Sequence, residues 1–133
     1  MDARTDGFDF LGYHFEAGKR WPRKKSLKKF KDIVRAKTRR TAGRSLAMVI
    51  TSLNPTLRGW FEYFKHSRRR TFGQLDAWIR RRLRSLLRQH IGLRGIAKVR
   101  GEDQVRWPNA FFADHGLFSL QEAHESVRQS PCG

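Results

Sequence analysis

Basic and aromatic side chains alternate through the middle of this chain, and together these residue types can bind nucleic acid. Between Lys19 and Arg100 lie 26 basic residues and three acidic ones, and the whole chain has a formal net charge of +17. Cationic side chains neutralise phosphates and release their counterions, and aromatic rings stack on unpaired bases. Because a surface that is only solvated normally mixes both signs, we predict phosphate contacts. We expect base stacking at Tyr13 and Trp21 alone, since most other aromatic residues fall on predicted apolar faces.

The candidate contacts are spread over several predicted elements. The most concentrated are a run of lysines near residue 25, the triplet Arg68–Arg70, and Arg80, Arg84 and Arg88, which lie four positions apart and are predicted to form a ridge along one side of a helix. We predict a more specific role for Arg58, beside Trp60, in fixing the central helix or a phosphate. An equal alternative is that Arg58 is an ordinary surface residue or forms a salt bridge. The full set is Lys19, Arg20, Arg23, Lys24, Lys25, Lys28, Lys29, Arg39, Arg40, Arg44, Arg58, Lys65, Arg68, Arg69, Arg70, Arg80, Arg81, Arg84 and Arg88.

The residue patterns of common enzyme sites are missing from the sequence. No glycine-rich phosphate loop precedes a Lys-Ser or Lys-Thr pair, and no nucleophile-elbow pattern surrounds a serine. The adjacent carboxylates Glu102 and Asp103 lie in a polar loop, where nothing would tune them for acid–base chemistry. No histidine pairs with another or with Cys132 at metal-ligand spacing; the histidines are His14, His66, His90, His115 and His124. We therefore predict no catalytic residue, no metal and no cofactor, so the chain by itself is not an enzyme.

An anionic membrane surface is the competing partner for so much positive charge. No run of about 18 apolar residues is present, and the basic segments carry apolar faces large enough for a protein core, so we predict no membrane partner. Residues 1–6 lack the apolar stretch of a signal peptide, and the single Cys132 excludes an internal disulfide framework. We expect a chain that stays in the cytoplasm, bound to nucleic acid.

The stretch Asn54–Phe64 is predicted to be the central helix that holds the basic elements in place. Asn54 can cap the first turn and Pro55 suits the first helical position, while Leu57, Trp60, Phe61 and Phe64 form one apolar face. Because a glycine inside a helix costs about 1 kcal/mol relative to alanine, Gly59 predicts the close approach of another backbone.

Helical spacing predicts further helices on both sides. One runs from an N-cap at Ser26 to about Thr41, and a short one is capped by Ser45 and ends before Asn54. A long helix begins near Thr71, residues 107–112 form an irregular apolar segment laid on the bundle, and Ser119 begins a final short helix.

The N-terminal region has the signals of a β-hairpin. Aromatic residues in the stretch Phe8–Phe15 predict a strand with a possible bulge at Gly12, and Arg20–Trp21 predicts a short return strand. Since a lone hairpin is marginal in water, it must pack on the helices or on another domain.

Several of these segments, in the same order, resemble the C-terminal part of bacterial group II intron reverse transcriptase/maturases. The resemblance covers about residues 7–120 and is carried by Phe10–Phe15 (FLGYHF), Pro22–Phe30 (PRKKSLKKF), Gly43–Leu46 (GRSL), Leu53–Phe64 (LNPTLRGWFEYF), Leu75–Arg84 (LDAWIRRRLR) and Pro108–Phe112 (PNAFF). It implies that the first motif is the end of the palm beside the primer grip, and that the remainder is the thumb, also called the maturase-specific or X domain. In that family this helical bundle binds intron RNA, helps it fold for splicing, and flanks the template–primer duplex.

The departures from the family pattern limit what carries over. No Asp-Asp pair occurs, so the polymerase motif Tyr-x-Asp-Asp is absent, and no Cys-rich or His-rich endonuclease segment follows. Polymerase and nuclease activities are therefore not expected. The segment 92–106 is short for the arginine-rich linker associated with this family.

We predict a mainly α fold, a three- to four-helix bundle with a short N-terminal β-hairpin. The expected divisions are residues 1–22 as a palm remnant, 23–127 as the helical maturase-specific domain, and 128–133 as a flexible tail. The predicted function is binding of group II intron RNA to promote its folding, splicing and mobility. Two alternatives stay open: the thumb of an RNA-directed DNA polymerase, which would bind an RNA/DNA hybrid together with the missing fingers and palm, and a general basic nucleic-acid-binding domain.

Overall fold

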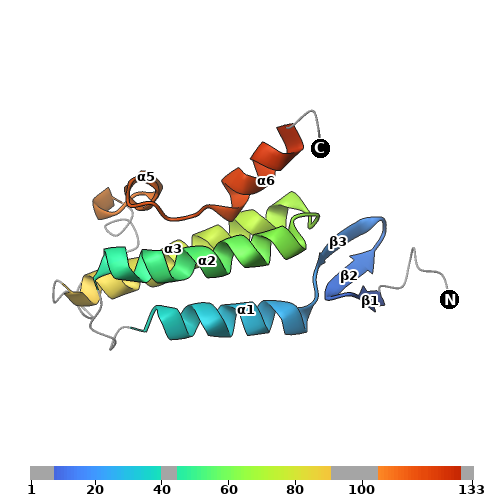
Figure 1. Ribbon diagram of the computed structural model, residues 1–133, viewed down its shortest axis with the longest axis horizontal. Helices are drawn as coiled ribbons and strands as arrows, with labels where there is room; N and C mark the ends of the chain where they lie inside the picture. Colours follow the sequence, from blue (N-terminus) through green and yellow to red (C-terminus); the bar gives the residue numbers. More distant parts are fainter. Residues whose placement is uncertain (1–7, 40–44, 91–104, 130–133) are drawn as a thin grey trace.

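Three long helices lie side by side in the computed structural model, which describes residues 8–39, 45–90 and 105–129. They are α1 (Lys24–Lys37), α2 (Leu46–Phe64) and α3 (Arg69–His90). Two short helices, α5 (Asn109–Asp114) and α6 (Leu120–Gln129), lie on the side of α2 and α3 away from α1, and a small sheet sits beside the start of α1 (Figure 1). The predicted mainly α fold is confirmed. The predicted divisions at residues 22 and 127 stay predictions.

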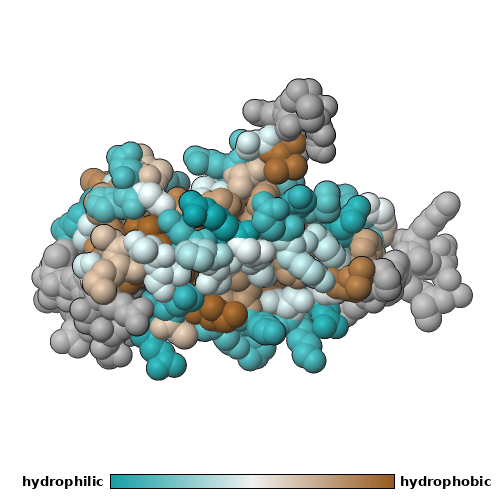
Figure 2. All heavy atoms as spheres, in the orientation of Figure 1, coloured by the Kyte–Doolittle hydropathy of each residue, from teal (hydrophilic) through white to brown (hydrophobic). Residues whose placement is uncertain are grey.

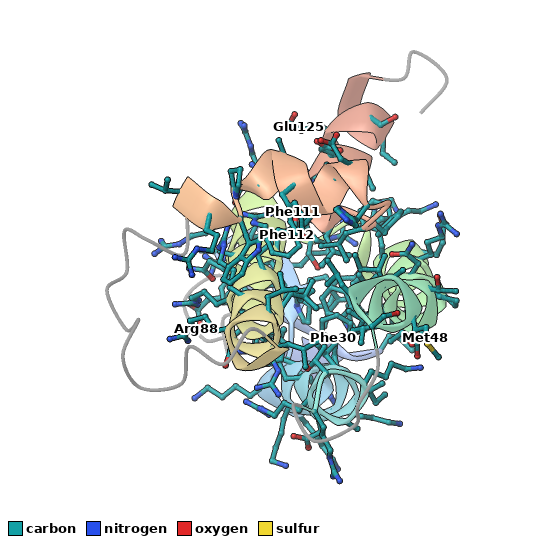
Figure 3. The ribbon with its side chains drawn as sticks, turned by 90° about the vertical axis from the view of Figure 1, so that its left-hand side faces the viewer. Phe30, Met48, Arg88, Phe111, Phe112 and Glu125 are labelled. Atoms are coloured by element: carbon teal, nitrogen blue, oxygen red, sulfur yellow. The ribbon has the colours of Figure 1, made fainter. Side chains whose placement is uncertain are left out.

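The core fills the space enclosed by the three long helices. Phe30 of α1 points into this space in an end-on view (Figure 3), where it stacks on Trp60 of α2 with ring centroids 4.4 Å apart. Full burial of each such side chain contributes about 1.5–3 kcal/mol. The least exposed apolar residues are Val34, Val49, Leu53, Leu57, Phe72, Ile79, Leu83, Leu86, Phe112 and Leu120.

Helix α1 begins and ends earlier than the sequence predicts. Its N-cap is Arg23, in extended conformation directly after Pro22, and not Ser26. The Ser26 hydroxyl instead donates to the carbonyl oxygen of Gly12 at 3.2 Å. The helix ends at Lys37, because Thr38 leaves the helical conformation and its hydroxyl donates to the carbonyl of Val34 at 2.8 Å.

Helix α2 is one continuous helix, so the predicted break at Asn54–Pro55 is wrong. Ser45 caps it as predicted, accepting a hydrogen bond from the Met48 amide at 3.3 Å. The Asn54 side chain caps nothing in its own helix. Its amide nitrogen donates to the Gly116 carbonyl at 2.8 Å, and its oxygen accepts from the Phe118 amide at 2.9 Å. A proline inside a helix typically costs about 3 kcal/mol. The apolar face that runs unbroken past Pro55, together with the Asn54 bonds, offsets this cost.

The sequence also places the start of α3 and the form of residues 107–112 wrongly. Helix α3 begins at Arg69, so Thr71 is a buried residue inside it and not its cap. Residues from Asn109 onward form the short helix α5 where an irregular segment was predicted.

Helix α6 begins after Ser119, as predicted, but its main capping group comes from α3. The carboxylate of Asp76 accepts hydrogen bonds from the Leu120 amide (3.0 Å), the Gln121 amide (3.0 Å) and the Ser119 hydroxyl (2.8 Å). Since the amides of a first helical turn have no partner within the helix, Asp76 fixes where α6 can lie.

The N-terminal sheet contains the predicted hairpin and one more strand. Strands β1 (Phe8–Phe10), β2 (Tyr13–Glu16) and β3 (Lys19–Pro22) form an antiparallel sheet in that order, with His14 opposite Trp21. Gly12 has φ of +85° and forms the turn between β1 and β2, so the region predicted as one strand with a bulge divides into two strands.

The sheet packs on the corner between α2 and α3. The Tyr13 hydroxyl donates to the carbonyl of Tyr63 at 2.9 Å, and the Tyr63 hydroxyl donates to the carbonyl of Leu11 at 2.7 Å. The amide of Arg68 donates to the carbonyl of Arg20 on β3 at 3.0 Å. Burial raises the pKa of Tyr13 above its usual value of 10.0. The helices therefore provide the packing surface that an isolated hairpin lacks.

Gly59 does not mark a backbone contact within the described part of the chain. A β-carbon built at this exposed residue would meet no atom within 4 Å, so that prediction is wrong.

Candidate nucleic-acid interface

Basic side chains from α1 and α3 meet along one side of the bundle. We call this surface the α1–α3 groove and define it by Lys31 and Arg35 of α1 and Trp78, Arg80, Arg81 and Arg82 of α3. The helical period places Lys31 and Arg35 one turn apart on α1, and Trp78 and Arg82 one turn apart on α3. Phe30 and Val34 of α1 and Ile79 of α3 belong to one buried apolar cluster, and the contacts of Lys31 and Arg35 with Trp78 show that the two pairs meet.

Trp78 is the centre of the groove. The Nζ of Lys31 lies 5.3 Å from the centroid of its ring, the Cζ of Arg35 lies 5.4 Å away and the Cζ of Arg82 lies 5.7 Å away. All three distances are within the range of cation–π attraction. One ring thus gathers three positive charges from two helices.

Two of these cations are held in place by further bonds. The Nε of Arg82 donates to the hydroxyl of Thr38 at 2.8 Å, and Arg35 contacts Asp32 at 2.9 Å. Asp32 also contacts Lys28 at 3.0 Å, and its pKa is held below its usual value, first by that hydrogen bond and then by the charges of Lys28 and Arg35. Asp32 offsets part of the charge at the edge of the groove.

The groove contains two hollows on either side of Trp78 and Arg81. One has a volume of about 590 Å³ and also takes in Lys31, Arg80 and Arg84; the other, of about 340 Å³, takes in Arg82 and Thr38. None of the described residues that line either hollow is acidic. Such a surface attracts anions, because no acidic residue lines its hollows and Asp32, at the edge of the groove, offsets only part of the positive charge.

The predicted ridge of Arg80, Arg84 and Arg88 does not form. Arg84 is only 6% exposed: its Nε donates to the carbonyl of Trp107, and its Nη2 donates to the side-chain oxygen of Asn109, both at 2.9 Å. Arg84 therefore holds the segment before α5 against α3. Arg80 and Arg88 are half-buried, and Arg88 lies on the outer side of α3 (Figure 3). The ridge fails because residues 107–112 fold over the middle of this side of α3.

A second basic surface lies where the sheet meets α1. The Cζ of Arg68 lies 4.0 Å from the centroid of Trp21, and a hollow of about 630 Å³ is lined by Trp21, His14, Arg23, Lys24 and Lys25. The expected stacking site at Trp21 is thus covered on one face by Arg68.

Tyr13 cannot serve as the other expected stacking site. It is only 8% exposed and its ring packs edge-on against Phe64 at 5.0 Å.

The remaining predicted contacts differ in exposure and in the partners that they already have. Arg69 pairs with Glu125 at 2.9 Å, Lys65 lies 3.7 Å from Glu62, and Arg58 sits 5.6 Å from the ring of Phe118. Arg23 and Lys65 are half-buried, and Arg40 and Arg44 lie outside the described residues. The exposed members are Lys19, Arg20, Lys24, Lys25, Lys28, Lys29, Arg39, Arg58, Arg68, Arg69, Arg70 and Arg81. On the face drawn in Figure 2, hydrophilic side chains cover much of the surface of α1 and α2, with apolar patches between them.

Four members of the groove were not among the predicted contacts. They are Lys31, Arg35, Trp78 and Arg82. The spacing of four between Lys31 and Arg35, and between Trp78 and Arg82, was the available signal. Only the packing of α1 on α3 shows that the two pairs face each other.

The family of the chain follows from a comparison with protein-family models. Residues 27–100 match the model of the group II intron maturase-specific domain, and this range is more than half of the chain. The chain belongs to this family. The match to the maturase-specific domain covers most of α1 and all of α2 and α3, and it includes every residue of the α1–α3 groove. A comparison with curated proteins finds no match.

Among the described residues, no group of three or more His, Cys, Asp or Glu side chains is placed to hold a metal ion. No helix in residues 8–39, 45–90 or 105–129 is long and apolar enough to cross a membrane.

Proposed function

We propose that this maturase-specific domain binds group II intron RNA and promotes its folding and splicing, and that the α1–α3 groove makes the main contact. One observation carries the proposal: four cations of the groove, from two helices, line its two hollows, and the described residues lining these hollows include no carboxylate. The four are Lys31, Arg80, Arg81 and Arg82. The excess of positive charge in the whole chain, +17, supports a polyanionic partner.

The mechanism is electrostatic. Arginine presents a planar fork of donors that can bind one phosphate through two hydrogen bonds, and lysine adds a point charge. Clamping phosphates from separate parts of the intron would lower the repulsion between them and stabilise the folded RNA. The exposed lysines of α1 and the basic surface around Arg68 would extend the contact beyond the groove.

The test is competitive binding by the full 133-residue chain at near-physiological salt. The three competitors are a folded group II intron RNA, an unrelated structured RNA of equal length, and an RNA/DNA hybrid. Preference for the intron RNA supports the proposal. Preference for the hybrid favours the thumb of a reverse transcriptase, and equal binding to all three means a general polyanion surface.

Matched variants locate the contact. Arg81 and Arg58 are both exposed arginines on helices, but only Arg81 lines the groove. Arg81→Gln should weaken intron binding and make the salt dependence of log K shallower by about 0.7–0.9, the share of one phosphate. Arg58→Gln removes the same charge and should change binding by less. Equal losses in the two variants would remove the groove from the proposal.

A further inference from the structure

We propose that the α1–α3 groove binds base-paired RNA through its phosphates and does not stack unpaired bases. This inference rests on the proposed function, since it names the form of RNA that the groove accepts. It starts from the surroundings of the aromatic ring that lines the groove.

Trp78 is the one aromatic residue among the described residues that line the two hollows. Three cations of the chain already lie around its ring, at 5.3, 5.4 and 5.7 Å from the centroid. A base that stacked on this ring would have to displace at least one of them. Stacking of a base on an aromatic side chain and the cation–π attraction that it would replace are of similar strength, so the exchange brings little net gain.

Two of the cations around Trp78 are also bonded to other side chains. Arg82 is bonded to Thr38 at 2.8 Å and Arg35 to Asp32 at 2.9 Å. Moving either one to admit a base would break these bonds and remove a charge from the phosphate site. The ring therefore serves as a support that positions cations.

The shape of the groove suits a regular row of phosphates. The lining residues of α3 run from Gln74 to Ser85, which at a rise of about 1.5 Å per residue is roughly 16 Å. Arg81 belongs to both hollows and lies between them. In a duplex the spacing of phosphates is already set, so binding to fixed cations orders little more of the RNA. A flexible strand would lose conformational freedom on the same surface.

Arg80 adds a donor to this site. Its Nε is buried and has no hydrogen-bond partner among the described residues, and the side chain lines the larger hollow of the groove. An anion in that hollow would lie beside the Arg80 side chain, whose Nε has unused hydrogen-bonding capacity, and buried polar groups in proteins are normally satisfied.

The test compares an RNA duplex of about 20 base pairs with each of its own strands, chosen to lack internal pairing, at one salt concentration. The intact chain should bind the duplex at least about tenfold more tightly than either strand. Trp78→Leu keeps an apolar side chain of helix-forming type and should weaken duplex and strand by the same factor. Arg81→Gln, at an exposed position where folding is not at risk, should weaken the duplex more than Arg58→Gln does.

Two results would overturn the inference. One is tighter binding of the strands than of the duplex. The other is a selective loss of strand binding in Trp78→Leu by about 5- to 160-fold, the effect of removing one stacked base. Either result leaves RNA binding by the groove intact. Duplex preference without preference for the intron over an unrelated structured RNA would instead keep this inference and overturn the proposed function.

Discussion

Asp76 offers the sharpest test of how this fold is held together. The residue lies on α3, is only 4% exposed, and accepts three hydrogen bonds from the start of α6 at 2.8, 3.0 and 3.0 Å. The perturbation is Asp76→Ala, which removes both acceptor oxygens, and with them all three hydrogen bonds, and adds no bulk.

The expected loss follows from the groups that are left without a partner. The amide of Leu120 is buried, and a buried donor without a partner costs about 1–3 kcal/mol. Loss of an N-cap costs about 0.5–2 kcal/mol, but this cost arises from the same hydrogen bonds, so the two figures are not simply added. We therefore expect Asp76→Ala to lower the free energy of unfolding by about 3 kcal/mol. Asp76→Asn, which keeps an acceptor oxygen but loses the charge, should lower it by about 1–1.5 kcal/mol.

Urea denaturation followed by circular dichroism measures this free energy, and hydrogen exchange of the α6 amides locates the effect. Asp32→Ala is the matched control, because Asp32 is also a bonded carboxylate on a long helix, but its partners are the cations Lys28 and Arg35 and it is exposed. Exposed ion pairs typically contribute at most about 1 kcal/mol. A loss below about 1 kcal/mol for Asp76→Ala, or one equal to that of the control, would refute the argument that a distant carboxylate fixes α6.

Three other predictions test separate contacts. Asn54→Ala should lower the free energy of unfolding by about 0.5–1.5 kcal/mol, because it removes an exposed hydrogen bond to the Gly116 carbonyl and a partly buried one from the Phe118 amide. Urea denaturation measures this loss, and a loss under about 0.5 kcal/mol, the usual limit for a surface change, would contradict the prediction. Arg84→Met removes the hydrogen bonds to Trp107 and Asn109 and should release residues 107–109 from α3. The release would be measured as faster hydrogen exchange in α5, and unchanged exchange would show that these two bonds do not hold the segment. Burial raises the pKa of Tyr13, so the neutral phenol of Tyr13 contributes fully to stability below pH 10.0, and this contribution is lost as the pH rises through the raised pKa. Denaturation between pH 9 and 11 should therefore show a larger fall in the free energy of unfolding for the parent chain than for Tyr13→Phe. Identical pH profiles of the two chains would rule this out.

Much of the fold follows from patterns that repeat within a few residues. The apolar spacing along residues 46–64 predicts helix on both sides of Pro55, though not that α2 is continuous, and the spacing along 72–86 predicts α3. Ser45 caps α2 as its type and position indicate. Alternating aromatic residues and the turn at Gly18 predict the hairpin of β2 and β3. The concentration of positive charge between Lys19 and Arg100 is a property of the sequence alone, and it already points to a polyanionic partner.

The wrong helix break at Asn54–Pro55 has a cause in the tertiary structure. Asn54 has the type of a helix cap and precedes a proline, yet its side chain bonds residues 62 and 64 positions away. The Asp76 carboxylate caps a helix that begins 44 positions later. Local patterns show that a residue can cap or break a helix, but the apolar face decides where the helix runs, and the free side chain then finds a distant partner.

The candidate site was also decided by tertiary structure. The basic excess and the helical positions of Arg81 and Lys31 can be read from the sequence, but the burial of Arg84 under the segment at Trp107 cannot. The meeting of Lys31 and Arg35 with Trp78 depends on how α1 packs against α3. Spacing along a chain determines which residues share a face of one helix. Which two faces meet is determined by the packing of the core. Burial of apolar area is the largest favourable term in folding, and because it is non-directional, the pattern within one helix does not show which other helix will cover its apolar face.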